Sequence, residues 1–232
     1  MKSTIKAVLF DLDDTLWAID PVIAQAEQVL FQWLKRHTPA VANDRFIDTF
    51  RARQQRLIEQ YPRYGYALWE LRHACLVEVF EEAGIKSAAA DDAMQVFSEA
   101  RNNVRLYDDV IPALASLGHR YMIGSISNGA ADLGHIGIAH YFRISLVASA
   151  FGRPKPEPAI FHAACDALEI HPGEAVYVGD DAENDVAGAM RAGMKTAWMK
   201  RPDLIPKKAL PENVRPDVIV HSLKDLEKLL MP

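Results

Sequence analysis

Three carboxylates near the start of the chain are well suited to chemistry. Asp11, Asp13 and Asp14 follow directly on a short apolar run, Ala7–Phe10. A run of this length, bounded by polar residues, is typical of a buried strand of a parallel sheet. Alternate residues of an extended chain point the same way, so Asp11 and Asp13 can share one face. Crowded carboxylates repel one another unless a hard cation compensates them, which makes this segment a candidate metal site; a solvated loop or a helix cap is the alternative.

Three further apolar runs end in polar residues. The runs and the residues that follow them are Tyr121–Ile126 with Ser127-Asn128-Gly129, Ile144–Ala148 with the proline-flanked Lys155, and Ala175–Val178 with Asp180, Asp181 and Asp185. Ligands of open α/β sheets bind just beyond the carboxyl ends of the strands. We therefore expect these polar groups to meet at one edge of a parallel sheet.

The elements that must position these groups fall into two sets. Residues 17–106 carry only helical patterns, a long one after Asp20-Pro21 and others at about 44–60, 66–83 and 89–105. From Tyr107 onward short strands, the last at Asp217–Val220, alternate with helices, which indicates βαβ units. We predict an α/β fold: a Rossmann-like parallel sheet core made of residues 1–16 and 107–232, with an α-helical domain, 17–106, inserted after the first strand.

The four strand ends, taken in order, resemble the motifs of the haloacid dehalogenase superfamily of aspartate-nucleophile hydrolases. They span nearly the whole chain. Asp11-Leu-Asp-Asp-Thr-Leu16, Gly179-Asp-Asp181 and Arg191-x-Gly-Met194 are also similar to bacterial phosphatases that act on FMN and on 5-amino-6-(5-phospho-D-ribitylamino)uracil. The resemblance implies a Mg²⁺-dependent phosphomonoester hydrolase in which residues 17–106 form a helical cap domain over the active site.

The resemblance also implies roles for the carboxylates. Asp11 would be the nucleophile and split phosphoester hydrolysis into two steps through an aspartyl-phosphate. Asp13 would protonate the leaving alkoxide and later take a proton from the attacking water. Mg²⁺ would be held by Asp11, by the backbone carbonyl of Asp13 and by Asp180, because it prefers a few carboxylates together with water and phosphate oxygens.

The same resemblance makes Ser127, Asn128 and Lys155 the binders of the substrate phosphate. Ser127 offers a hydroxyl, and the amides of Asn128 and Gly129 can form an anion-binding concavity. Lys155 supplies a positive charge to the phosphate and so acts in catalysis. An ordinary Asn-Gly turn and a solvated loop lysine are the alternatives for these residues.

Three more residues are expected around this set. Thr15 would orient the first loop through hydrogen bonds, or simply cap a helix. Either Asp181 or Asp185 would hold Lys155 or a metal-bound water, and the sequence leaves the two open. The alternative for both acids is a negative charge that complements the macrodipole at a helix N-terminus.

Aromatic residues of the inserted segment are candidates for a substrate pocket. Trp17, which follows the first motif, is placed at the pocket mouth, and Tyr64, Tyr66 and Trp69 offer surfaces on which a heterocycle could stack. At helical spacing, such aromatics more commonly pack into a core.

Bulk properties narrow the class of partner. The chain has 232 residues and a formal net charge of −5, which gives no electrostatic footprint for nucleic acid or an anionic membrane. Cys75 and Cys165 lie in apolar helical patterns and are expected to be buried thiols in a reducing compartment. The first apolar run is too short for a signal peptide. We expect a cytoplasmic enzyme, monomer or homodimer, that acts on a small phosphate ester.

Three other functions remain open. A phosphomutase shares all four motifs. A C–halogen hydrolase, the activity that names the superfamily, needs neither a metal nor an acid at position 13, so Asp13, Asp180 and Asp185 argue against it. A non-catalytic binding protein that retains the fold would have no need of acids at every motif.

Overall fold

A computed structural model describes residues 5–204 and 209–231. These residues form two compact units. The core unit takes in the described residues of Met1–Ala18, Arg105–Gly129 and Gly137–Pro232, and the helical unit comprises Ile19–Val104 and Ala130–Ile136. The segment 130–136 was expected in the core; in the structure it belongs to the helical unit, where the Asp132 N–H donates to Asn102 Oδ1 (2.9 Å).

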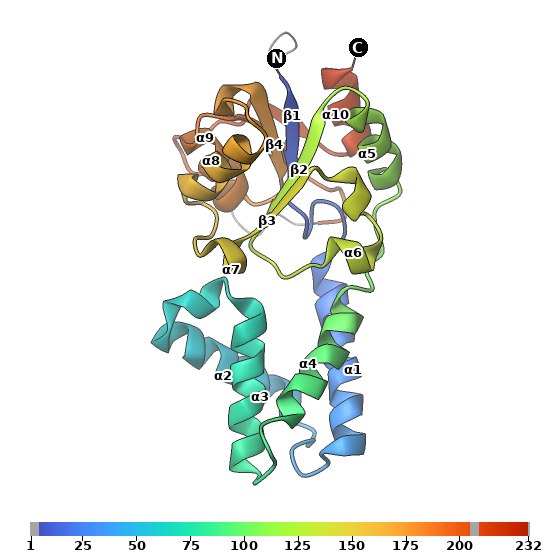
Figure 1. Ribbon diagram of the computed structural model, residues 1–232, viewed down its shortest axis with the longest axis vertical. Helices are drawn as coiled ribbons and strands as arrows, with labels where there is room; N and C mark the ends of the chain where they lie inside the picture. The colour runs from blue at the N-terminus through green and yellow to red at the C-terminus, as the bar shows by residue number, and fades with distance from the viewer. Residues whose placement is uncertain (1–4, 205–208, 232) are drawn as a thin grey trace. The chain divides into compact units, whose positions relative to one another are not determined.

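A single sheet organises the core unit (Figure 1). It has six strands in the order β3-β2-β1-β4-β5-β6, and all neighbouring strands are parallel. The strands are β1 (Ala7–Phe10), β2 (Met122–Ser127), β3 (Ile144–Val147), β4 (Ala175–Gly179), β5 (Lys195–Met199) and β6 (Val218–Val220). Strands β1 and β4 are buried throughout, as expected for central strands covered on both faces. The predicted α/β fold with a Rossmann-like parallel sheet is confirmed.

Strand β5 was not among the strands predicted from apolar runs. It opens with Lys195 and Thr196, so its continuous apolar stretch is only Ala197–Met199. That stretch is too short to stand out by itself. Its burial between β4 and β6 comes from tertiary pairing, which a local pattern does not reveal.

Helices cover both faces of the sheet. Figure 1 shows α5 and α10 on the opposite side from α8 and α9. The helices are α5 (Val110–Gly118), α7 (Ala148–Phe151), α8 (Pro158–Ala167), α9 (Gly188–Arg191) and α10 (Leu223–Leu230), with short 3₁₀ helices η2 (Ala139–Tyr141) and η3 (Pro172–Glu174). The helix expected at 182–192 begins instead as a π-helical segment, η4 (Ala182–Ala187). Such segments are often found at functional sites.

The helical unit has its own apolar core. Its helices are α1 (Ile19–His37), α2 (Phe46–Gln60), η1 (Pro62–Gly65), α3 (Leu68–Glu82), α4 (Ala89–Arg101) and the single turn α6 (Leu133–Ile136). Apolar stripes at helical spacing, including Leu30, Leu76 and Phe80, are buried against one another. Cys75 is buried here and Cys165 in the core unit, and both are free thiols.

The segments that lead into and out of the inserted helices pair with each other within the core unit. Trp17 and Leu106 form an antiparallel bridge, and the Tyr107 N–H donates to the carbonyl of Leu16 (3.0 Å). The segment that leaves the sheet and the segment that returns to it therefore lie side by side.

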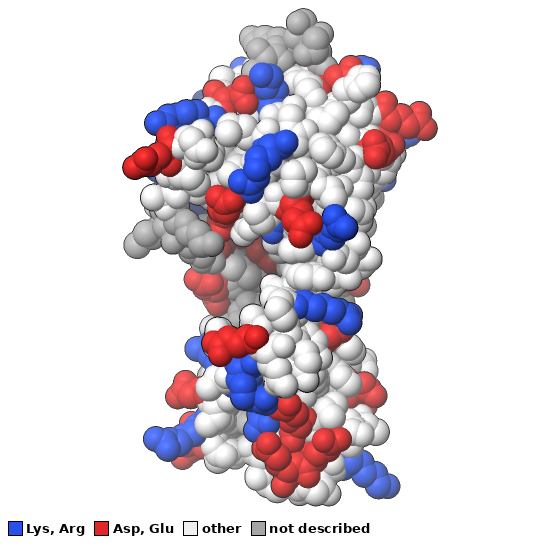
Figure 2. Space-filling model, turned by 90° about the vertical axis from the view of Figure 1, so that its left-hand side faces the viewer, with Lys and Arg blue, Asp and Glu red and all other residues white. Residues whose placement is uncertain are grey.

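The outer surface carries charges of both signs. On the face in Figure 2, Lys and Arg are interspersed with Asp and Glu, and the basic groups form no continuous surface there. Across 5–204 and 209–231, the helices all lack the combination of length and apolarity that a bilayer crossing requires.

Candidate active site

The candidate site lies beside β1, where the strand order of the sheet changes direction. Strands β2 and β3 extend the sheet on one side of β1, while β4 to β6 extend it on the other. Ligands of open α/β sheets bind at such a switch point, beyond the carboxyl ends of the strands. Asp11 follows β1 and Asp180 follows β4, and the Asp11 N–H donates to the Val178 carbonyl (2.8 Å). Strand pairing thus brings two carboxylates together that lie far apart in the sequence.

The ammonium group of Lys155 stands at the centre of the site. It donates to Asp11 Oδ1 (2.6 Å), to Asp185 Oδ1 (2.6 Å) and to the hydroxyl of Tyr177 (2.9 Å), and its side chain is 3% exposed. Burial alone would lower the pKa of Lys155, but Asp11 and Asp185 raise it well above its usual value of 10.5. The lysine is therefore a fixed positive charge and not a solvated loop residue.

Three carboxylates surround this charge. Oxygen atoms of Asp11, Asp180 and Asp185 all lie within 4.8 Å of one another. Burial raises the pKa of Asp11 to about 7 against the opposing effect of Lys155. Burial, together with Asp11 and Asp185, raises the pKa of Asp180 to about 9. Hard carboxylate oxygens suit Mg²⁺, and a bound cation would favour the charged forms of these buried, crowded carboxylates.

The π-helical segment gives its two acids different surroundings. Asp181 Oδ1 accepts from the Glu183 and Asn184 N–H groups (2.9 and 2.7 Å) and so caps the segment. Asp185 is 1% exposed and reaches Lys155, and its second oxygen accepts from the Asp181 N–H (2.9 Å). Gly179 makes room for this carboxylate, because a Cβ there would overlap the Asp185 side chain. Of the two acids that the sequence left open, Asp185 is the one in contact with Lys155.

The loop after β2 holds the lysine in place. The Asn128 side chain donates to the Lys155 carbonyl (2.9 Å) and accepts from the Lys155 N–H (2.8 Å). Ser127 is buried, and its hydroxyl accepts from the Gly129 N–H (3.0 Å). The Asn128 side chain is therefore bonded to the Lys155 backbone, and the Gly129 N–H, expected to face an anion, is bonded to Ser127 instead.

The loop after β1 carries the remaining predicted residues. Thr15 is buried, and its hydroxyl lies 3.4 Å from Asp11 Oδ2 and 3.3 Å from Asp180 Oδ1. The Trp17 indole N–H donates to Asp13 Oδ1 (2.9 Å), and Trp17 is completely buried. Trp17 was expected to line a pocket mouth; the structure instead packs its ring in the core and directs its N–H at Asp13.

One residue of the site was missed in the sequence. Tyr177 lies on β4, inside an apolar run, and its hydroxyl accepts from Lys155 while donating to the Ile126 carbonyl (2.9 Å). The available signal was a single hydroxyl in an otherwise apolar, fully buried strand. A buried hydroxyl requires partners, and here they belong to the candidate site.

The aromatic residues expected in the pocket have mixed surroundings in the helical unit. Tyr64 is half-buried and packs against the helical core, while Trp69 is 44% exposed and stacks on His73 (5.2 Å between ring centroids). Tyr66 is half-buried. Exposed ring surface among these residues therefore belongs chiefly to Trp69.

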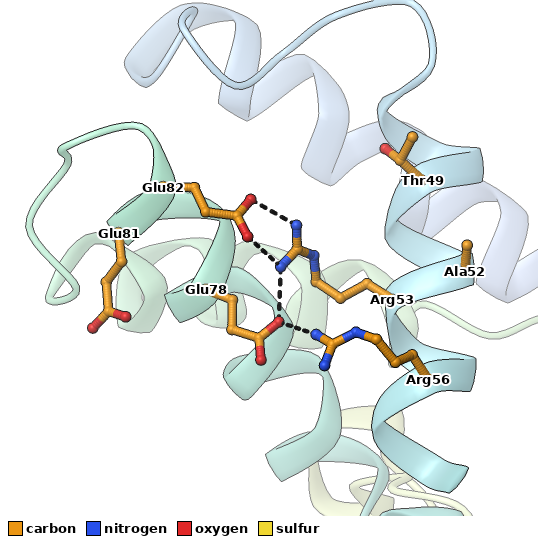
Figure 3. A pocket seen from close by; sticks show the side chains of 7 residues that line it. All are labelled: Thr49, Ala52, Arg53, Arg56, Glu78, Glu81 and Glu82. Carbon is orange, nitrogen blue, oxygen red and sulfur yellow. Dashed lines mark hydrogen bonds and ion pairs between the residues drawn. The ribbon is translucent and has the colours of Figure 1, made fainter. Parts of the chain in front are cut away.

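A charged groove lies between α2 and α3 of the helical unit (Figure 3). Arg53 pairs with Glu82 through Nη1 and Nη2 (2.9 and 2.7 Å) and with Glu78 (2.8 Å), and Arg56 also pairs with Glu78. Figure 3 shows both arginines turned toward these carboxylates. Because the positive charges are already paired, the groove is not suited to bind a phosphate.

Comparison with known proteins identifies the family of the chain. The sequence model of the haloacid dehalogenase-like hydrolases matches residues 5–193. The 5-amino-6-(5-phospho-D-ribitylamino)uracil phosphatase YigB of Escherichia coli (strain K12) is 31% identical over 200 residues, with 84% of each chain covered. A phosphoserine phosphatase of Thermus thermophilus is 29% identical, with 96% of this chain and 98% of the relative covered.

A solved structure is similar along almost the entire chain. The crystal structure of a 2-haloacid dehalogenase from Pseudomonas syringae pv. Tomato DC3000 superposes with a TM-score of 0.89 at 34% identity and covers 97% of both chains. The resemblance inferred from the four strand ends is thus confirmed. The chain belongs to the haloacid dehalogenase-like hydrolases.

Proposed function

We propose that the protein is a Mg²⁺-dependent phosphomonoester hydrolase that acts on a small phosphorylated metabolite through an aspartyl-phosphate at Asp11. The observation that supports this most is the Lys155 ammonium bonded to Asp11 and Asp185, with Asp180 beside them. One edge of the sheet thereby combines a carboxylate nucleophile, a fixed positive charge and oxygen ligands for a cation. The phosphatases among the relatives agree with this proposal.

The first half of the reaction transfers the phosphoryl group to the protein. A carboxylate oxygen of Asp11 bonds to phosphorus as the bond from phosphorus to the leaving oxygen breaks. Asp13 gives its proton to that oxygen, and the Trp17 indole N–H fixes the orientation of the Asp13 carboxyl group. Lys155 balances negative charge on the phosphoryl oxygens.

The second half regenerates the carboxylate. Water attacks phosphorus, its proton passes to Asp13, and inorganic phosphate leaves Asp11. Asp11, Asp180 and the backbone of Asp13 would hold Mg²⁺, with Asp185 positioned through its contact with Lys155. Mg²⁺, when bound, offsets the repulsion between carboxylates and phosphate and stabilises the charge of the transition state.

A screen of phosphorylated metabolites with Mg²⁺ tests the proposal. Release of inorganic phosphate from a generic ester is the expected result, and no release from any ester would overturn it. Transfer of the phosphoryl group to a second hydroxyl of a sugar phosphate, in place of water, would identify a phosphomutase instead.

The similarity to a 2-haloacid dehalogenase favours a second candidate, hydrolysis of a carbon–halogen bond. There a carboxylate displaces halide from carbon, and the halide leaves without needing a proton. The acid at Asp13 and the cation site around Asp180 would then have no chemical task. Release of halide from a 2-haloacid without release of phosphate from any ester would favour this candidate.

We expect activity to depend on Mg²⁺. Excess EDTA should abolish phosphate release, added Mg²⁺ should restore it, and Mn²⁺ or Co²⁺ should substitute. Ca²⁺ should inhibit, because it takes more oxygen ligands at looser distances. Titration calorimetry with Mg²⁺ alone gives a second readout, in which Asp180→Asn should weaken binding and Asp166→Asn, an exposed change on α8, should not. Full activity in excess EDTA would contradict the expectation.

The substrate proposed is a flavin-pathway phosphate, either FMN or its ribitylaminouracil precursor. The core residues of the proposed mechanism contact the phosphoryl group, the cation and water, so discrimination between esters must come from elsewhere. The helical unit, acting as a cap, is the proposed source, since closure over a site excludes water and adds contacts. The similarity to YigB supports this choice.

We expect FMN or the precursor to have a higher kcat/KM than glycerol phosphate. Trp69→Ala and Tyr66→Ala should lower that preference while a small generic ester is still hydrolysed, because the chemistry lies in the core unit. Ile219→Ala, which trims an exposed apolar side chain of β6, is the control. Equal kcat/KM values for FMN and glycerol phosphate would leave a phosphatase but remove the flavin-pathway assignment.

A further inference from the structure

Arg201 is a buried arginine outside the matched residues 5–193, and it lies against the loop after β1 that carries Thr15. Arg201 Nε and Nη2 both donate to the carbonyl of Thr15 (3.1 and 2.8 Å). Arg201 Nη1 donates to both oxygens of Asp109 (3.0 and 2.8 Å). The side chains of Arg201 and Asp109 are 5% and 9% exposed. Arg201 therefore joins the first loop to the start of α5 through a fork that only a guanidinium provides.

This fork is itself held rigidly. Asp109 Oδ2 also accepts from the Leu223 N–H (2.7 Å) at the start of α10, and the Arg201 guanidinium lies over the Tyr107 ring (4.2 Å to the centroid). The Tyr107 N–H meanwhile holds the next carbonyl of the loop, that of Leu16 (3.0 Å). Two consecutive carbonyls of the loop are thus fixed from outside it.

The contact between Arg201 and the Thr15 carbonyl is relevant to the site because the Thr15 hydroxyl faces two of its carboxylates. The Thr15 hydroxyl lies within 3.4 Å of Asp11 Oδ2 and within 3.3 Å of Asp180 Oδ1. Threonine is β-branched and therefore restricted at χ1, so the position of its hydroxyl depends on where its own backbone is held. Fixing the Thr15 carbonyl therefore fixes the hydroxyl that contacts the nucleophile and a cation ligand.

We infer that Arg201, oriented by Asp109, is a positioning residue that acts through Thr15 on the carboxylates of Asp11 and Asp180. The inference rests on the proposed phosphatase function. Groups that orient metal ligands from outside typically contribute on the order of 10- to 100-fold in metal affinity or activity. Arg201 is one step further removed, so an effect of about tenfold is expected.

The principal variant is Arg201→Lys, which keeps a positive charge beside Asp109 but loses the fork. On a generic ester we expect kcat to fall about tenfold, with KM nearly unchanged, because the substrate does not touch Arg201. The dissociation constant for Mg²⁺, measured by calorimetry without substrate, should rise. Arg53→Lys is the matched control, since it makes the same change in the Arg53–Glu82 fork of the helical unit (Figure 3) and should leave both quantities unchanged.

A double-mutant cycle separates positioning through Thr15 from a general effect on the fold. Thr15→Val removes the hydroxyl and keeps the carbonyl that Arg201 holds. If Arg201 acts through that hydroxyl, Arg201→Lys should cost much less kcat in the Thr15→Val background than alone. Losses that simply multiply, or an unchanged Mg²⁺ affinity in Arg201→Lys, would overturn the inference.

Two further results are informative. If Arg201→Lys does not fold, Asp109→Asn takes its place, because Arg201 keeps its contact with Thr15 but loses its charged partner; it should show the same losses to a smaller degree, and unchanged kcat and Mg²⁺ affinity would overturn the inference. A wild-type protein without activity on any ester would defeat the proposed function. A wild-type protein that is active, with Arg201→Lys equal to it, would defeat only the role of Arg201.

Discussion

Asp11→Asn is expected to abolish turnover of every phosphate ester while the protein stays folded. The amide cannot form the bond to phosphorus, so the covalent step is lost entirely. Folding should survive, because Lys155 keeps its contacts with Asp185 and Tyr177 (2.6 and 2.9 Å). The change also removes a carboxylate whose pKa burial has raised to about 7, and whose charge is therefore costly in the folded state.

Three measurements check this expectation. Phosphate release gives the turnover, thermal unfolding reports the fold, and rapid acid quenching followed by peptide mass analysis should find phosphate on the Asp11 peptide of the wild type alone. Asp166→Asn makes the same chemical change at an exposed position of α8 and should match the wild type in all three. Substantial activity of Asp11→Asn in a preparation free of wild-type protein would disprove the aspartyl-phosphate mechanism.

Asp13→Asn is expected to slow turnover by about a hundred- to ten-thousand-fold, the usual contribution of general acid–base catalysis. The loss should depend on the leaving group. An alkoxide needs the proton of Asp13 to depart, whereas an acidic phenol leaves readily without it. The Trp17 indole can still be hydrogen-bonded by the amide oxygen of asparagine, so the geometry of the loop should be preserved.

Comparing two esters in the same preparation tests this role. The ratio of wild-type to Asp13→Asn rates should be much larger for an alkyl phosphate than for an aryl phosphate with an acidic phenol. Equal ratios for the two esters would show that Asp13 is not the proton donor to the leaving group. If Asp13 has the expected role, the aryl ester should show a burst of phenol release. The remaining defect of Asp13→Asn then lies in the hydrolysis of the aspartyl-phosphate, where Asp13 acts as base.

The parallel sheet and the meeting of Asp11, Asp180 and Lys155 could be inferred because their signals are local. An apolar run followed at once by a polar residue identifies a strand end, and parallel pairing brings strand ends to one edge. The distinction between Asp181 and Asp185 could not be inferred in this way. It depends on where each acid lies: Asp181 caps the start of the π-helical segment, whereas Asp185 lies within it and contacts Lys155.

Tyr177 and Arg201 were missed because their partners are distant in the sequence, and Trp17 was given the wrong surroundings. Tyr177 looks like one more apolar position of a buried strand until the Lys155 ammonium is placed beside it. Trp17 follows the first motif and was assigned to a pocket, but its burial and its bond to Asp13 depend on how the loop turns back. Arg201 has no motif of its own, and its contact with Thr15 spans 186 positions.

The pairing of Trp17 with Leu106 has a consequence for how this chain can diversify. Because the insertion leaves and re-enters the core at adjacent points, it is attached to the sheet as a closed loop. The entropic free-energy cost of closing a flexible loop grows slowly, by only about 0.6 kcal/mol for each doubling of its length. The insertion can therefore become longer or shorter, or be exchanged, at little cost to the stability of the core, so the proposed substrate recognition can change while the proposed catalytic residues stay in place.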